Sequence, residues 1–381
     1  MTYLSAVVLL PVVSKNFNTI FLKSFRVLLL PLAGLYGGIV RLRNWLFDKK
    51  YLPSSTFHFP LITVGNLAVG GTGKSPMVEY ILSILHRQFN LAVLSRGYKR
   101  KTKGYVLAEK NSTALELGDE PMQFHIKYPD VAVAVCEERL VGISYLLQDI
   151  PGLQAIVLDD AFQHREVVSG LNIILTEYAN LYCDDFFLPT GDLRDEKKAA
   201  ERAEIIVVTK CPPDLSPEEK QKIIRRLSPL PQQRVFFTSI EYATPYHIFN
   251  QADEWHLTQR DEVLLVCGIA NPVPLKDFLH DKVHSYQQLD FADHHIFSID
   301  DLQEIQRQFK KLSGRDKLIL TTEKDAVRLL KFQQQLEHVP LYVLPIRPIF
   351  LFNEGDFFNE IIIQFIRNFP IQPIHEEKEN K

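Results

Sequence analysis

The sequence predicts an α/β protein built on a parallel sheet with helices on both faces. Short apolar runs rich in Val and Ile alternate with segments of helical spacing between residues 59 and 209. Continuous β-branched runs are typical of parallel strands, because helices bury both faces of such a sheet. A glycine-rich loop stands directly between the first run and a helix-like segment, an arrangement that binds anions.

The expected elements follow one another in chain order. We expect strands at 59–64, 91–95, 131–135, 154–158, 171–176 and 204–209, and helices at 76–88 and 137–149. Proline-rich sequence around a charged helix at 211–233 ends this series. Further strands at 235–240, 262–267, 317–321 and 340–345 then predict a second, smaller α/β unit.

Composition limits the classes of function. Hydrophobic residues make up 46% of the 381 residues and charged residues 23%, which is typical of a globular protein. The net charge of −3 is too small to indicate nucleic-acid binding. The four cysteines lie far apart without metal-ligand spacing, so we expect core residues of a protein from a reducing compartment.

Residues 68–75 predict a phosphate-binding P-loop with the sequence Ala-Val-Gly-Gly-Thr-Gly-Lys-Ser. Its backbone N–H groups and the following helix N-terminus would bind the anionic oxygens of a nucleoside triphosphate. The predicted nucleotide-binding residues are Gly70, Gly71, Thr72, Gly73, Lys74 and Ser75. Lys74 would reach the β- and γ-phosphates, and the Ser75 hydroxyl would bind Mg²⁺. Ala68 replaces the first glycine of the strict pattern, which adds only a methyl group.

The N-terminal 50 residues are basic, with seven basic side chains and one acidic one, so the rest of the chain carries −9. One helical face is formed by Phe17, Ile20, Phe21, Phe25, Leu28 and Leu29, and the opposite face by Lys15, Thr19, Lys23 and Arg26. Such a helix either lies in an anionic membrane surface or packs on the protein core. The apolar stretches 1–14 and 27–40 are too short to span a bilayer. No basic residue precedes the apolar stretch 3–13, which argues against an export signal.

Three acidic or basic sites follow the P-loop. Asp159 and Asp160 end the strand 154–158, where P-loop enzymes hold Mg²⁺, although a turn or helix cap also fits. Asp119, between Gly118 and Glu120-Pro121, is expected in a loop, where it could accept a proton or hold Mg²⁺, although a turn followed by a helix start also fits. Arg194 ends the segment 188–194 and suits either a bidentate clamp on phosphate or a surface ion pair.

Two more clusters are less specific. Asp293, His294 and His295 could ligate a metal, orient a base or simply form a loop. The segment Ser95-Arg96-Gly97-Tyr98 is followed by several basic residues, which would attract an anionic substrate or lipid headgroups, or form a solvated turn.

Taken together, these segments closely resemble the tetraacyldisaccharide 4′-kinase family. The matching segments are 64–66, 70–76, 95–98, 118–121, 159–164, 188–194, 268–272, 291–294 and 322–325. The resemblance extends from about residue 27 to 350. Three departures are conservative: Ser75 where threonine is usual, Ala161 where glycine is common, and Asp195 where glutamate often follows the arginine.

The resemblance implies transfer of the γ-phosphoryl group of ATP, with Mg²⁺, to the 4′-hydroxyl of an acylated glucosamine disaccharide 1-phosphate. This step belongs to lipid A biosynthesis and gives lipid IVA. The resemblance also implies a monotopic enzyme on the cytoplasmic face of the Gram-negative inner membrane. The lipid substrate favours the membrane interpretation of the basic N-terminus, because a four-chain lipid does not leave the bilayer freely.

The same resemblance implies roles for individual residues. Asp119 would be the catalytic base and His294 its partner, while Lys74 and Arg194 would neutralise phosphate charge. Ser75, Asp159 and Asp160 would handle Mg²⁺. Because Asp119 and His294 would come from separate domains, we expect full activity to require domain closure.

We divide the chain into five parts on these grounds. They are N-terminal amphipathic, membrane-associating helices (1–50), a P-loop kinase core (51–233), a smaller α/β domain (234–350), a closing helix (351–371) and a disordered tail (372–381).

Two other functions are compatible with the P-loop. A P-loop GTPase or metallochaperone-type switch would need a guanine-recognition motif, but the nearest candidate, 209–212, has proline where aspartate is required. A peripheral membrane ATPase would hydrolyse ATP without phosphorylating a lipid. We expect neither a nucleic-acid partner nor an obligate protein partner.

Overall fold

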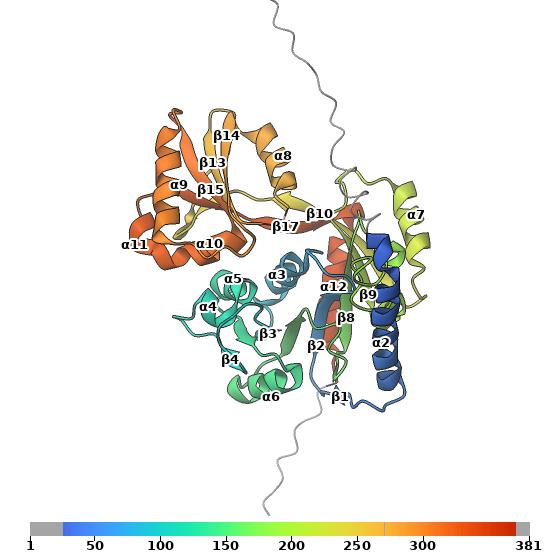
Figure 1. The fold of residues 1–381 in the computed structure, drawn as a ribbon. Coiled ribbons are helices and arrows are strands. Elements are labelled where there is room, and N and C mark those ends of the chain that lie inside the picture. The colour runs from blue at the N-terminus through green and yellow to red at the C-terminus, as the bar shows by residue number, and fades with distance from the viewer. Residues whose placement is uncertain (1–25, 270, 371–381) are drawn as a thin grey trace, which may run out of the picture.

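The structure is a computed structural model that describes residues 26–269 and 271–370. Two α/β units are joined by the strands β10 (Arg234–Tyr242) and β17 (Ile346–Phe350) (Figure 1). The predicted helix at 15–29 falls largely outside the described residues, and the predicted tail 372–381 falls wholly outside them.

The larger unit contains a nine-stranded sheet whose seven inner strands run parallel. In order across the sheet, the strands are β17, β10, β9 (Ile205–Thr209), β8 (Leu171–Glu177), β2 (Leu61–Asn66), β6 (Ala155–Asp159), β3 (Leu91–Ser95), β5 (Ala132–Val135) and β4 (Val106–Leu107). The edge strands β4 and β17 are antiparallel to their neighbours. All six strands predicted between residues 59 and 209 are present, each within two residues of its expected bounds. A separate pair, β1 (Ser55–Thr56) and β7 (Val167–Val168), lies outside this sheet.

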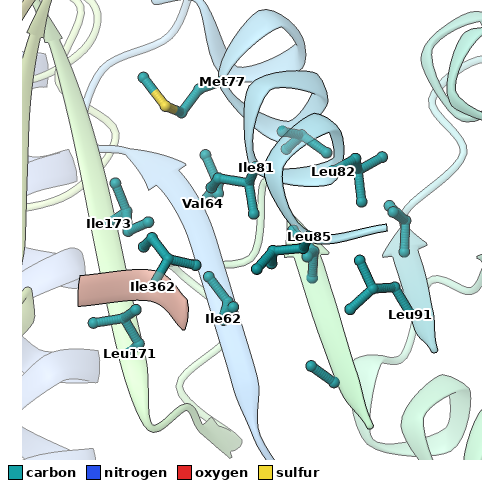
Figure 2. Packing of buried hydrophobic residues seen from close by; sticks show 14 of the residues in the cluster. Ile62, Val64, Met77, Ile81, Leu82, Leu85, Leu91, Leu171, Ile173 and Ile362 are labelled. Atoms are coloured by element: carbon teal, nitrogen blue, oxygen red, sulfur yellow. The ribbon is translucent and has the colours of Figure 1, made fainter. Parts of the chain in front are cut away.

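Both faces of the large sheet are buried, because every residue of β2, β6 and β9 is buried. One face packs against α3 (Lys74–Leu85), α5 (Asp119–Lys127) and α12 (Gly355–Arg367). The other face packs against α6 (Arg139–Asp149) and α7 (Pro217–Leu227). Figure 2 shows Ile62 and Val64 of β2 beside Ile81 and Leu85 of α3, with Ile362 of α12 next to them. The apolar runs therefore form the buried parallel strands that the sequence predicts.

The smaller unit is built on a six-stranded sheet. In order across the sheet, the strands are β12 (Asn250–Glu254), β11 (Tyr246–His247), β16 (Leu341–Leu344), β15 (Lys317–Thr322), β13 (Glu262–Cys267) and β14 (Ser285–Asp290). Helices α9 (Ile299–Lys311), α10 (Glu323–Leu329) and α11 (Gln333–Leu336) cover one face, and α8 (Val273–Lys282) covers the other. The Ser298 hydroxyl accepts a hydrogen bond from the backbone N–H of Asp301, which caps the start of α9.

The large sheet extends into residues that the sequence analysis assigns to the second unit. The predicted strand at 235–240 lies in β10, which pairs with β9 of the large sheet and with β17. The chain therefore leaves the large sheet after Tyr242, not at residue 234, and returns to it through β17. Helix α12 then packs its buried Phe358, Ile362 and Ile366 into the core beneath α3.

The described N-terminal part is helical from its start. A short 3₁₀ helix (Val27–Leu29) leads into α2 (Leu30–Asp48), and Pro31 occupies the first turn, where its missing N–H has no helical partner to lose. In Figure 1, α2 lies at the edge of the larger unit, on the side away from the smaller unit.

Among the described helices, none combines the length and the apolar character needed to cross a bilayer.

Candidate active site

The P-loop turns between the carboxyl end of β2 and the start of α3. Gly70 (φ +109°) and Gly73 (φ +86°) adopt left-handed backbone conformations that favour glycine. The Asn66 side-chain amide donates a 2.8 Å hydrogen bond to the Thr72 hydroxyl, and the Thr209 hydroxyl donates 2.9 Å to the Thr72 carbonyl. These bonds tie the loop to β2 and β9 and leave the α3 N-terminus facing the carboxyl edge of the sheet.

Lys74, Asp160 and Arg194 meet beside this loop. Lys74 Nζ lies 3.8 Å from Asp160 Oδ1, while the Arg194 guanidinium binds both oxygens of Asp160, with 3.1 Å from Nη1 to Oδ2. Arg194 Nη2 also donates to Asn66 Oδ1 at 2.6 Å. Burial raises the pKa of Asp160, but the Arg194 hydrogen bond and the Lys74 charge outweigh it and hold that pKa below its ordinary value. The structure thus brings three predicted residues together around one carboxylate.

The neighbouring Asp159 lies in a different environment from Asp160. Its side chain is buried, accepts a 3.0 Å hydrogen bond from the Ser95 hydroxyl and forms no ion pair with any described residue. Burial, followed by the negative charges of Glu120 and Asp160, raises the pKa of Asp159 to about 7. The fully buried Arg139 donates to the backbone carbonyl of Asp159 at 3.0 Å, not to its carboxylate. The Asp159 carboxylate therefore lacks the cation that Asp160 has.

Asp119 is the first residue of α5, so the alternative of a turn followed by a helix start is confirmed and the loop is not. Gly118 precedes it at φ +93°, and a Cβ there would lie 3.1 Å from the Tyr98 carbonyl oxygen. This close approach fixes the start of α5 against the loop that follows β3. The charge of Glu120, the next residue, acts on Asp159, so the start of α5 faces the acids at the end of β6.

His294 reaches Asp119 from the smaller unit. It lies in the connection between β14 and α9, and its Nδ1 is 2.9 Å from Asp119 Oδ2. The two side chains come from separate units, as expected, and they are in contact in this structure. The neighbouring His295 instead contacts Asp301 at 2.9 Å, at the cap of α9. The two histidines therefore serve different partners, which does not favour a shared metal site.

Two further residues at this site, Arg328 and Lys324, were missed by sequence reasoning. Arg328 Nε donates to Asp119 Oδ1 at 2.9 Å, and Nη2 donates to Asp119 Oδ2 at 2.5 Å. Lys324 Nζ lies 3.3 Å from His294 Nε2. The segment 322–325 carried part of the family resemblance, and helical spacing from its Asp325 to Arg328 was the available signal.

The charge on Asp119 follows from these contacts. Burial raises the pKa of Asp119, but hydrogen bonds from Arg328 and His294 outweigh it and hold that pKa below its ordinary value. His294 Nδ1 lies 2.9 Å from Asp119 Oδ2 and 3.1 Å from Arg328 Nη2, and its other ring nitrogen, Nε2, lies 3.3 Å from Lys324 Nζ. Asp119 is thus an ionised acceptor held from two sides.

Within residues 26–269 and 271–370, no three His, Cys, Asp or Glu side chains gather as a metal-binding cluster.

Comparison with known proteins identifies the family. The family model for LpxK, tetraacyldisaccharide-1-P 4′-kinase, matches residues 25–366. The chain belongs to this family. It is 44% identical to the tetraacyldisaccharide 4′-kinase of Bacteroides thetaiotaomicron, over 92% of this chain and 96% of that protein. It is 46% identical to the enzyme of the same name from Flavobacterium johnsoniae, over 90% of this chain and 97% of that protein.

A solved LpxK structure has the same fold. The crystal structure of the "apo" form of LpxK from Aquifex aeolicus in complex with ATP aligns with a TM-score of 0.71 and 26% identity. The alignment covers 90% of this chain and 99% of that one. The P-loop core and the smaller α/β unit predicted from the sequence are therefore those of an LpxK kinase.

Proposed function

We propose that this protein transfers the γ-phosphoryl group of ATP to the 4′-hydroxyl of a tetraacyldisaccharide 1-phosphate, which gives lipid IVA in lipid A biosynthesis. Membership of the LpxK family supports the reaction and the substrate class. The observation that carries the proposal is the Asp119–His294 contact at the start of α5, next to the P-loop acids. This arrangement offers an acceptor hydroxyl a carboxylate beside a triphosphate site.

The nucleotide would be held by the P-loop. Residues 70–73 present backbone N–H groups at the start of α3, and this end of a helix favours anionic oxygens. Lys74 and Arg194 would leave Asp160 and bind phosphate oxygens of the nucleotide. These oxygens carry more negative charge than one carboxylate, so they bind the two cations more strongly. A small hollow lies next to Gly73 and is lined by Lys210 and Ser239 among others.

Mg²⁺ fits the donors present at this edge of the sheet. A Mg²⁺ ion in such a site takes one hydroxyl and one or two carboxylates, together with phosphate oxygens. Ser75 and Asp159 would supply the hydroxyl and a carboxylate, since Asp159 is buried without a paired cation. Asp160 could join them once Arg194 moves to phosphate. The bound ion would neutralise charge on the transferred group.

Proton transfer would rest on Asp119 and His294. Phosphoryl transfer passes through a loose transition state, so positioning and charge neutralisation matter more than a strong base. A carboxylate with a lowered pKa can still accept the hydroxyl proton late in the reaction, while His294 Nδ1 contacts its Oδ2 at 2.9 Å. Lys324 Nζ lies 3.3 Å from the other ring nitrogen of His294, Nε2.

Helix α2 would place the enzyme at the cytoplasmic face of the inner membrane, where the lipid substrate resides. Its solvent-exposed apolar residues are Leu30, Leu32, Leu35, Ile39, Leu42 and Trp45, preceded by Leu28. The spacing of Leu28, Leu32, Leu35, Ile39 and Leu42 puts them on one face of the helix, here called the α2 stripe. A stripe of this kind suits a helix lying in the membrane interface, because each buried CH₂ contributes roughly 0.8 kcal/mol.

The test is a direct assay of product. Purified protein would be incubated with ATP, Mg²⁺ and tetraacyldisaccharide 1-phosphate in mixed micelles, and the lipid analysed by mass spectrometry. We expect one added phosphate on the lipid, and its loss in Asp119→Asn with nucleotide binding retained. Hydrolysis of ATP without a phosphorylated lipid would favour a peripheral ATPase. A preference for GTP over ATP would favour a P-loop switch.

A further inference from the structure

Arg328 is a buried cation at the boundary between the two units. It lies on α10 of the smaller unit, 6% exposed, and binds Asp119 at the start of α5 in the larger unit. Its third nitrogen, Nη1, donates to Asp325 Oδ1 at 3.1 Å, and Asp325 is itself fully buried. Asp325 in turn accepts from the backbone N–H of Gly268 at 2.9 Å. The guanidinium is therefore held in place by its own unit before it meets Asp119.

The contacts of Asp119 leave one place for a further donor. An ionised carboxylate has about four acceptor positions, two on each oxygen. Arg328 Nη2 and His294 Nδ1 take both positions on Oδ2, and Arg328 Nε takes one on Oδ1. Among the described residues nothing else donates to Asp119, so the remaining position is on Oδ1. Arg328 thus decides which oxygen, in which orientation, is open to an incoming hydroxyl.

A second ion pair also joins α10 to α5, so the two units do not depend on Arg328 alone for their contact. Glu323 Oε1 at the start of α10 lies 2.6 Å from Lys127 Nζ at the end of α5. Lys127 also lies 2.6 Å from Glu79 of α3. The two helices are therefore tied at both ends of α5, and only the Arg328 tie involves Asp119.

We propose that Arg328 is the positioning residue for the acceptor site: its fork holds Asp119 so that Oδ1 receives the 4′-hydroxyl. This inference rests on the proposed kinase function. Arg328 acts through Asp119 and does not itself contact the reacting atoms. A guanidinium suits this role because two parallel N–H groups fix a carboxylate plane, which one ammonium group cannot do.

The test compares Arg328→Lys with Arg328→Gln in the full-length enzyme, by steady-state kinetics across pH. In Arg328→Lys we expect kcat to fall about 100-fold, as for a misplaced reacting group, with the KM for ATP unchanged. The acidic limb of the kcat–pH profile of Arg328→Lys should lie at the same pH as in the wild type, because the positive charge remains. In Arg328→Gln the same fall should come with a new acidic limb at higher pH than in the wild type, since burial then raises the pKa of Asp119 with less opposition.

Other titratable groups around Asp119 are accounted for in this design. They are His294 and Asp293 from the β14–α9 connection, Lys324 and Asp325 from α10, Glu120 from α5, and Tyr98, whose ring lies 5.7 Å from that of His294. All are kept in both variants, so a limb present only in Arg328→Gln belongs to the lost cation.

Glu323→Gln is the matched control, because it weakens the other tie between α5 and α10 and leaves Asp119 untouched. We expect its kcat within about threefold of the wild type and an unchanged pH profile. The inference is overturned if Glu323→Gln reproduces the Arg328 results, or if Arg328→Gln keeps wild-type kcat. A wild-type enzyme that makes no phosphorylated lipid would instead overturn the proposed function. Thermal unfolding of each variant checks folding, and Arg328→Lys keeps the test open if Arg328→Gln is unstable.

Discussion

The Tyr36 hydroxyl donates a 3.1 Å hydrogen bond to the backbone carbonyl oxygen of Arg194. Tyr36 lies on α2 beside its exposed apolar stripe, and Asn44, two turns further along, donates 2.8 Å to Asp195. The helix proposed to lie in the membrane therefore also supports the loop proposed to handle phosphate. Membrane attachment and the position of Arg194 are connected through one helix.

Tyr36→Phe should lower kcat without changing membrane binding. The substitution removes one hydrogen bond, worth roughly 1 kcal/mol, from the loop that carries Arg194, so we expect kcat to fall about fivefold. Kinetics in micelles and vesicle co-sedimentation would measure the two effects separately. Unchanged kcat with a lower unfolding midpoint would instead show that Tyr36 only stabilises the fold.

Leu35→Glu should weaken membrane binding without affecting nucleotide binding. Leu35 is 66% exposed in the α2 stripe, so the charge costs no packing in the folded protein but disfavours insertion into the interface. Val141→Glu on α6, where Val141 is 38% exposed, is the matched control away from the stripe. We expect Leu35→Glu alone to lose binding to anionic vesicles. Equal partitioning of the two variants would contradict the assignment of this face.

Much of the larger unit could be predicted because its signals are local. The strands from β2 to β9 are continuous apolar runs, and the P-loop glycines mark a turn whose shape depends on few neighbours. The edge strand β14 was missed because its residues, Ser285–Asp290, are half-exposed and polar. Strand β10 was assigned to the wrong sheet because its apolar run is compatible with either one.

The cluster around Asp119 could be predicted only in part. Asp119 and His294 were linked by family resemblance, but Arg328 is 209 positions from Asp119, and its role depends on how α10 packs against α5. The spacing of apolar residues along the sequence does not show which helix packs against which. Likewise, the sequence does not distinguish Asp159 from Asp160. In the fold, Asp159 is buried without a paired cation, whereas Asp160 pairs with Arg194.

Arg194→Lys should separate charge from geometry at the phosphate site. A lysine keeps the positive charge but cannot bind Asp160 and Asn66 with a planar fork, so we expect kcat to fall by more than tenfold with a small change in the KM for ATP. Steady-state kinetics would measure both constants. Arg226→Lys, whose pair with Asp184 is exposed, should remain close to wild type. A large rise in KM with kcat intact would place Arg194 in ground-state binding only.

Gly65→Ala should destabilise the protein and disturb the acidic turn after β6. A Cβ at this position in β2 would lie 2.5 Å from the Phe162 Cβ and 3.1 Å from the Phe162 backbone nitrogen. Overpacking of this kind costs about 1–3 kcal/mol and would shift the chain just after Asp160. Urea unfolding would measure the loss. Gly38→Ala in α2 has open space around the new methyl group and should be neutral or slightly stabilising.

Stability should fall as pH rises from about 4.5 to about 7, because of Glu79 on the P-loop helix. Burial, followed by the charge of Glu323, raises the pKa of Glu79 from 4.5 to about 7, despite its contact with Lys127. Between these two values the native state holds a proton that the unfolded chain has released, so the free energy of unfolding decreases with pH in that window. Glu79→Gln removes this titration and should reduce the slope measured by urea unfolding at several pH values from 4.5 to 8, while buried Asp159, whose pKa is also raised to about 7, keeps its own contribution. Glu241→Gln, at the exposed pair with Arg347, is the control and should keep the wild-type slope. A slope unchanged in Glu79→Gln would mean that another group titrates there.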